Sequence, residues 1–274
     1  MVVWINGDLL PDNEAKISVF DHGLVTGDGV FETVKVTNGT LFALSRHLVR
    51  LGRSAAGLGL AEPDMDQIRA GALAVVDASP MLPLARLRIT VTAGMSALGS
   101  ERGNSPLTTI VALAEQKPPA AAIDVVVAPW RRNEEGALAG LKTTSYAGNV
   151  RALAYAAERG GGEAIFANVA GNLCEGTGTN VFVAIGGKLI TPPLSSGCLA
   201  GVTRGLVLEW FGAAEDELPL TALSNADEAF LTGTTRDVQP IRHVNGRKLA
   251  AVPGSITRKA AEVFAMRATE SPDP

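Results

Sequence analysis

The chain has 274 residues, of which 46% are hydrophobic, and a formal net charge of -4. This length and hydrophobicity favour one large or two medium folded domains over disorder. The slightly acidic balance, without a basic stripe, argues against nucleic-acid binding.

The cysteines and histidines bear on three further properties: disulfide bonds, cellular compartment and metal binding. Cys174 and Cys198 are too few for a disulfide framework, so we expect reduced, structural thiols and a cytoplasmic protein. The three histidines are scattered without metal-ligand spacing, so no metal is predicted. Met1–Asp8 lacks the pattern of a signal peptide, and no run of about twenty apolar residues predicts a membrane span.

The first 117 residues predict a smaller N-terminal α/β domain. Apolar residues at helical spacing indicate two helices, at Leu44–Leu60 and Gln67–Val76. Alternating or continuous apolar runs indicate strands at Val2–Asn6, Phe31–Thr37, Arg86–Thr92 and Thr108–Ala114. Asn38-Gly39 is typical of a hairpin turn, and Gly94–Ser105 is an expected loop.

Lys117-Pro118-Pro119-Ala120 indicates a linker, which we place at residues 118–122, before a larger C-terminal domain at 123–274. Expected strands are Ile123–Val127, Glu163–Asn168 and Val181–Ile185, and expected helices are Asn149–Glu158, Thr203–Phe211 and Ile256–Met266. Thr269–Pro274 is expected to fray. The predicted fold class is α+β with two domains.

Five features together suggest a site for a phosphorylated aldehyde. Lys142 supplies an amine for a Schiff base, and Glu175 supplies a carboxylate that can face a ring nitrogen. Thr203 at a predicted helix start, the polar turn containing Thr234, and Arg50 can bind a phosphate. Taken alone, each has an ordinary explanation: a surface lysine at a helix start, a turn glutamate, a capped helix, a short turn and a solvated helix face.

The order of these features along the chain is more specific than any one of them. The motifs are Ile5-Asn6-Gly7, Asp21-His22-Gly23, Gly27-Asp28-Gly29-Val30-Phe31-Glu32, His47-x-x-Arg50-Leu51, Glu175-Gly176-x-Gly178-x-Asn180-Val181-Phe182, Leu199-x-Gly201-Val202-Thr203-Arg204 and Glu228–Thr234. In this order the chain resembles the class IV aminotransferase family of pyridoxal-phosphate (PLP) enzymes. That family includes branched-chain and D-amino-acid transaminases and aminodeoxychorismate lyase. The resemblance implies a two-domain fold of type IV, PLP as cofactor and a homodimer.

The resemblance also implies roles for particular residues. Lys142 would carry the cofactor and move the proton, and Glu175 would pair with the pyridine nitrogen. The remaining cofactor-binding residues would be Arg50, Asn180, Val202, Thr203 and Thr234, with Tyr146 or Asn149 near the hydroxyl of the ring.

The branch of the family is predicted from Phe31-Glu32-Thr33-Val34-Lys35. This segment lacks the glycine and arginine of the Phe-Glu-Gly-x-Arg pattern of branched-chain transaminases, and Thr92–Met95 lacks the Arg-x-His pair of D-amino-acid transaminases. Phe-Glu-Thr before a basic residue is similar to aminodeoxychorismate lyases, which serve folate biosynthesis.

We therefore predict a lyase that releases pyruvate and 4-aminobenzoate from 4-amino-4-deoxychorismate. Its substrate-binding residues would be Phe31, Thr33, Lys35 and Arg102. One alternative is an aminotransferase acting on D-amino acids, branched-chain amino acids or amines. A lesser alternative is a non-catalytic PLP-binding protein.

Overall fold

The computed structural model describes all residues from Met1 to Pro274, and they form two compact units. Unit 1 comprises 1–117, 141–146 and 272–274, and unit 2 comprises 118–140 and 147–271. The chain therefore leaves unit 1 after Lys117, where the linker was predicted. It also returns to unit 1 twice, in segments that we had assigned to the C-terminal domain. The first of these returns carries Lys142.

Unit 1 is built on a six-stranded antiparallel sheet in the order β2-β1-β6-β5-β3-β4. Its strands are β1 Val2–Ile5, β2 Asp8–Pro11, β3 Gly29–Thr37, β4 Thr40–Leu41, β5 Ala85–Thr92 and β6 Thr108–Glu115. Its helices are α1 His22–Val25, α2 Leu44–Leu58 and α3 Met65–Asp77. The β3–β4 hairpin turns at Asn38 and Gly39, whose φ angles are 46° and 79°. Two residues with positive φ are what a two-residue hairpin turn of this kind requires.

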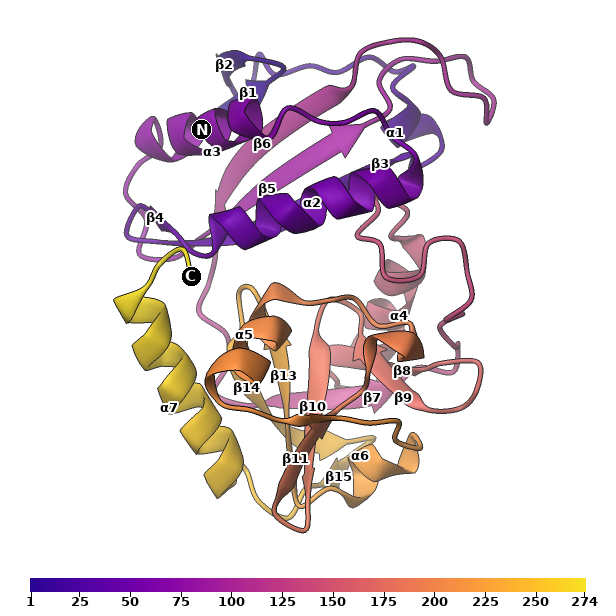
Figure 1. Cartoon of the computed structure of the whole chain (residues 1–274), viewed down its shortest axis with the longest axis vertical. Helices are drawn as coiled ribbons and strands as arrows, with labels where there is room; N and C mark the ends of the chain where they lie inside the picture. Colours follow the sequence, from indigo (N-terminus) through magenta and orange to yellow (C-terminus); the bar gives the residue numbers. More distant parts are fainter. The chain divides into compact units, whose positions relative to one another are not determined.

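One face of this sheet packs against α2 and α3, as Figure 1 shows. On β3 the core residues Val30, Val34 and Val36 alternate with Phe31, Thr33 and Lys35, so the two sets lie on opposite faces. The buried set joins Leu48 and Leu51 of α2 and Ile68 and Val75 of α3 in the core of unit 1.

Unit 2 contains a nine-stranded mixed sheet, in the order β12-β11-β10-β13-β14-β7-β8-β9 with β15 paired to β14. Its strands are β7 Ile123–Val127, β8 Glu163–Ala167, β9 Leu173–Gly176, β10 Asn180–Ile185, β11 Lys188–Thr191, β12 Ala214–Glu215, β13 Glu228–Gly233, β14 Asp237–Val244 and β15 Arg247–Lys248. Its helices are α4 Ala147–Ala157, the 3-10 turn η1 Leu194–Ser196, α5 Val202–Trp210, α6 Thr221–Asn225 and α7 Ser255–Glu270.

Burial distinguishes the central strands of unit 2 from those of unit 1. All of β8 and nearly all of β10 and β13 are buried, which is typical of strands covered on both faces. Val181, Val183 and Leu231 belong to the main core, while Phe182 and Phe230 stack with their ring centroids 4.9 Å apart. The longest helix, α7, has 16 residues, and no helix combines the length and hydropathy that a membrane span needs.

One expectation about local structure was wrong, and two of the ordinary explanations do not hold. The tail beyond Thr269 is not frayed, because α7 continues to Glu270 and the carbonyl of Pro272 accepts from the backbone N–H of Ala43. Glu175 lies in strand β9 rather than in a turn. Lys142 does not start a helix: its segment pairs with β3 through a bridge between Thr143 and Val30. In each case a partner far away in sequence decides the conformation.

Candidate functional site

Lys142 is held in place by the backbone of unit 1. Its carbonyl accepts from the N–H of Phe31 at 2.9 Å, and its own N–H donates to the hydroxyl of Ser54 at 3.2 Å. The N–H of Thr144 donates to the carbonyl of Gly29 at 2.8 Å. These bonds fix the position from which the lysine side chain extends.

Aromatic rings surround the amine of Lys142. Its Nζ lies 4.5 Å from the ring centroid of Phe31 and 6.0 Å from that of Tyr146. The two rings meet edge to face, with centroids 5.3 Å apart. Rings arranged in this way can form the walls of a slot for a flat molecule that reacts with the amine. Of the two residues proposed for the ring hydroxyl, Tyr146 is therefore beside Lys142. The amide of Asn149 instead donates to the carbonyl of Thr177 in unit 2.

Arg88 is a cation that the sequence interpretation missed. Its guanidinium carbon lies 3.7 Å from the centroid of the Phe31 ring, and it faces Thr33 across the β3–β5 ladder. Its Nε donates to the hydroxyl of Thr90 at 3.1 Å, and no carboxylate pairs with it. The alternation Ala85-Arg86-Leu87-Arg88-Ile89 was the available signal, because it places both arginines on the sheet face that carries Phe31.

Arg50 belongs to a buried triad on the other face of the sheet. Its Nε and Nη2 donate to the two oxygens of Glu32 at 2.8 and 2.7 Å, and Nδ1 of His47 lies 2.7 Å from Glu32 Oε2. Burial raises the pKa of Glu32, but the charge of Arg50 and the hydrogen bonds from Arg50 and His47 outweigh it and lower the pKa to about 2. Arg50 therefore does not lie on a solvated helix face. A buried arginine in a fixed orientation suits phosphate binding.

Arg102 is held by Asp28 and by the C-terminal end of α2. Its Nε and Nη2 donate to both oxygens of Asp28 at 2.6 Å each, and Nη1 and Nη2 donate to the carbonyls of Gly59 and Leu58 at 2.5 and 2.8 Å. Nδ1 of His22 completes this cluster at 2.7 Å from Asp28. These bonds attach the β5–β6 loop to the end of α2, and they already engage all three nitrogens of the guanidinium.

In unit 2 the side chain of Glu175 is fixed from two sides. Its Oε2 accepts from the N–H of Leu199 at 2.9 Å, and its Oε1 lies 3.3 Å from Nε of Arg132. The guanidinium carbon of Arg132 lies 4.3 Å from the centroid of the Phe166 ring. Sequence reasoning missed Arg132, which stands 43 positions before Glu175 and shares no local pattern with it.

Asn180 lies so close to residue 201 that only glycine fits at that position. Its amide donates to the carbonyl of Leu199 at 2.8 Å. A Cβ at Gly201 would lie 2.0 Å from Oδ1 of Asn180, so a side chain does not fit there. Asn180 and Glu175 thus hold the segment that leads into α5.

The chemistry of these groups fits a phosphorylated pyridine. The first turn of α5, at Val202 and Thr203, receives no side-chain cap, and N–H groups at a helix start attract an anion. Thr232 lies opposite Asn180 in the β10–β13 ladder. Its buried hydroxyl has no hydrogen-bond partner within the protein, so it can bond to a ligand. Thr234 follows in the next turn and is half-buried. Glu175 supplies the acceptor that a protonated ring nitrogen needs.

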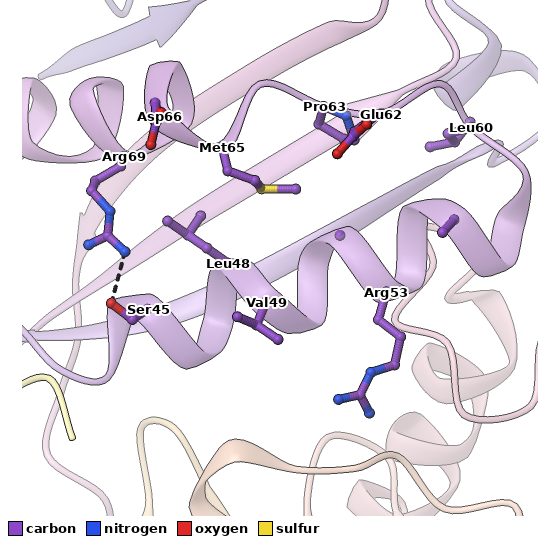
Figure 2. A pocket seen from close by; sticks show the side chains of 12 residues that line it. Ser45, Leu48, Val49, Arg53, Leu60, Glu62, Pro63, Met65, Asp66 and Arg69 are labelled. Carbon is purple, nitrogen blue, oxygen red and sulfur yellow. Dashed lines mark hydrogen bonds between the residues drawn. The ribbon is translucent and has the colours of Figure 1, made fainter.

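A separate pocket of about 510 Å³ lies on α2, the α2–α3 loop and α3 in unit 1. Figure 2 shows its apolar wall at Leu48, Val49 and Met65, and the hydrogen bond from Arg69 to Ser45 at its rim. None of the residues expected to bind cofactor or substrate lines this pocket.

The two cysteines are buried, and burial raises the pKa of both thiols. Both are thus expected to be unreactive.

Comparison with known proteins places most of the chain in one family. The family described as "Amino-transferase class IV" matches residues 29–244. A putative branched-chain-amino-acid aminotransferase of Methanocaldococcus jannaschii is 34% identical over 96% of this chain and 95% of its own length. A D-alanine aminotransferase of Bacillus licheniformis is 31% identical over 94% of each chain. The crystal structure of a branched-chain aminotransferase from Thermoproteus uzoniensis with norvaline superposes with a TM-score of 0.91, at 30% identity, over 97% of this chain and 93% of that one.

Proposed function

Because the chain belongs to the class IV aminotransferase family, we propose that it transfers an amino group from an amino acid or amine to a keto acid. The protein is a PLP-dependent enzyme with the type IV fold. The similar proteins named above are aminotransferases for branched-chain amino acids or D-alanine. They support the aminotransferase alternative over the lyase that we predicted from Phe31-Glu32-Thr33.

The observation that carries this proposal is the position of Lys142. A lysine fixed through its backbone, with its amine 4.5 Å from one aromatic ring and 6.0 Å from another, is suited to hold a flat aldehyde cofactor. Glu175 binds the ring nitrogen in this proposal. Arg50, Asn180, Thr234 and the start of α5 bind the remaining polar groups, and Tyr146 approaches the ring hydroxyl.

PLP, when bound, supplies an electron sink that weakens the bond broken at the carbon bearing the amino group. The amine of Lys142 would take up the proton from that carbon and later give it back, so it would act first as a base and then as an acid. Glu175 would accept a hydrogen bond from the ring nitrogen and so keep the proton there. Tyr146 and Phe31 exclude water from around the amine of Lys142.

Arg88 is the proposed anchor for the substrate carboxylate. It lacks a carboxylate partner and shares its sheet face with Phe31 and Thr33, and the Phe31 ring that it contacts is also the ring beside the amine of Lys142. A guanidinium fork matches a carboxylate in geometry and charge. Lys35, two residues beyond Thr33 on the same face, remains a second candidate for an additional acidic group. Arg102 would have to break its four hydrogen bonds to take this role.

Product analysis with purified, PLP-loaded protein tests the proposal. The substrates are branched-chain L-amino acids, D-alanine and simple amines, each with a keto-acid acceptor, and aminodeoxychorismate alone. We expect amino transfer that requires the acceptor. Release of 4-aminobenzoate and pyruvate without any acceptor would restore the lyase interpretation, and failure with every donor, despite bound PLP, would favour the non-catalytic alternative.

We also infer that the enzyme is a homodimer. Val19, Phe20 and Leu24, at and just before α1, are 69%, 50% and 63% exposed, which leaves apolar surface for a second copy to cover. Light scattering coupled to gel filtration measures the mass, and a monomeric mass that persists at high protein concentration would refute this inference.

A further inference from the structure

Glu163 is a buried carboxylate in unit 2 that takes no part in the proposed reaction. It begins β8, and the residue is 2% exposed. A carboxylate in such a position is costly unless donors surround it. Its donors come mainly from a turn that follows Glu175 directly in sequence.

That turn joins β9 to β10 and contains Thr177 and Thr179. The N–H of Thr177 donates to Oε1 of Glu163 at 3.1 Å, and the Thr177 hydroxyl donates to the same oxygen. The hydroxyl of Thr179 donates to Oε2 at 3.3 Å. A Cβ at Gly176 would lie 2.1 Å from the Thr179 hydroxyl oxygen and 3.3 Å from the carboxyl carbon of Glu163, so the chain passes close to the carboxylate here.

Glu163 also reaches the turn between β13 and β14, which carries Thr234. Its Oε2 lies 3.7 Å from Nη2 of Arg236, whose Nη1 donates to Gln239 at 2.7 Å. The two turns touch each other, because a Cβ at Gly233 would lie 3.3 Å from Cγ2 of Thr179. One carboxylate therefore ties together the turn after Glu175 and the turn that contains Thr234.

We propose that Glu163 is a positioning residue for the cofactor: it sets the direction of the Glu175 carboxylate and the place of Thr234 by binding the turns beside them. This inference rests on the cofactor roles proposed above for Glu175 and Thr234. Glutamine at position 163 keeps the size of the side chain but replaces one acceptor oxygen by a donor. It cannot accept from both threonine hydroxyls and carries no charge for Arg236, so one hydroxyl must reverse its role and the two turns are held less firmly.

Cofactor titration of the Glu163→Gln apoenzyme provides the first measurement. We expect the dissociation constant for PLP to rise roughly ten-fold or more, on the scale of one charge-assisted hydrogen bond. We also expect a lower kcat at saturating PLP with a smaller change in KM, and a shifted absorption band of the bound cofactor. Neither is expected from a loss of stability alone.

Glu228→Gln is the matched control. Glu228 is also buried, at 6% exposure, and accepts from the N–H groups of Ile256 and Thr257 at 3.1 and 2.8 Å, where it caps α7. We expect this variant to melt at a lower temperature but to bind PLP as the unmodified enzyme does. If Glu163→Gln and Glu228→Gln show the same PLP affinity, kcat and absorption band, the proposal is wrong.

Two further measurements separate this inference from the proposed site. Unchanged PLP affinity and kcat in Glu175→Gln would overturn the cofactor role of Glu175 and, with it, the inference about Glu163. If Glu163→Gln does not fold, Thr177→Val combined with Thr179→Val tests the same contacts with the carboxylate intact. Normal PLP affinity in that double variant would overturn the inference while leaving the proposed function in place.

Discussion

Glu32→Gln removes the carboxylate to which both Arg50 and His47 bind in the core of unit 1. Glu32 is 0% exposed, and its pKa is lowered from 4.5 to about 2. At about 1.4 kcal/mol for each pH unit, that difference corresponds to roughly 3 kcal/mol of stability. Breaking a buried ion pair from one side costs about 3–5 kcal/mol, which agrees with this value. A chain of a few hundred residues loses about 2–4 °C in Tm for each kcal/mol, so Tm should fall by roughly 6–12 °C near neutral pH.

The sign of the pH dependence follows from the direction of the shift. A carboxyl group with a lowered pKa in the folded state stabilises the fold above its unfolded pKa, near 4.5, and this contribution is lost as the pH falls toward about 2. The difference in Tm between the unmodified protein and Glu32→Gln should therefore be largest near neutral pH and shrink in acid. Circular dichroism melts of the PLP-free proteins measure it, with the exposed Glu62→Gln as control. Equal melting temperatures near neutral pH, or a difference that is constant down to about pH 2, would refute the reasoning.

Three further substitutions test the site. Lys142→Ala should abolish borohydride-reducible attachment of PLP while the protein stays folded, since alanine keeps both backbone hydrogen bonds of this residue; a reducible adduct on another lysine would contradict the assignment. Glu175→Gln should keep the cofactor but lower kcat by orders of magnitude, because an amide cannot hold the proton on the ring nitrogen, and full activity would return Glu175 to a structural role. Arg88→Ala should raise KM for amino-acid donors with little change in PLP affinity, because it removes the proposed carboxylate anchor. An unchanged KM in that variant would show that another group binds the carboxylate.

Local patterns determined much of the secondary structure. Helical spacing of leucines indicated α2, and the structure ends this helix at Leu58, where Gly59 takes a φ of 73°. The Asn38-Gly39 turn was also predicted correctly, because the conformational demands of such a turn are met by the two residues themselves. The order of the motifs from Ile5-Asn6-Gly7 to Glu228–Thr234 was sufficient to predict the family, which the match over residues 29–244 confirms.

These local patterns could not predict contacts between residues that are far apart in the sequence. Glu175 stood in a segment that looked like a turn, yet pairing of β9 with β8 makes it part of a strand. Nothing in the helix that carries Arg50 indicated that its guanidinium would pair with Glu32 of β3. Arg102 was predicted as a substrate ligand in a polar loop, but Asp28 and the carbonyls of Leu58 and Gly59 engage its guanidinium.

The sequence by itself thus determined the cofactor, because the order of its motifs identifies a family of PLP-dependent enzymes. The tertiary structure decided which charged side chains are paired within the protein and which have no such partner and can bind a substrate. Arg88 has no carboxylate partner beside Phe31, whereas Arg102 is occupied, and both facts depend on strand register and loop packing. An ion pair depends on the distance between two charged groups in space. Asp28 and Arg102 form such a pair although they are 74 positions apart along the chain.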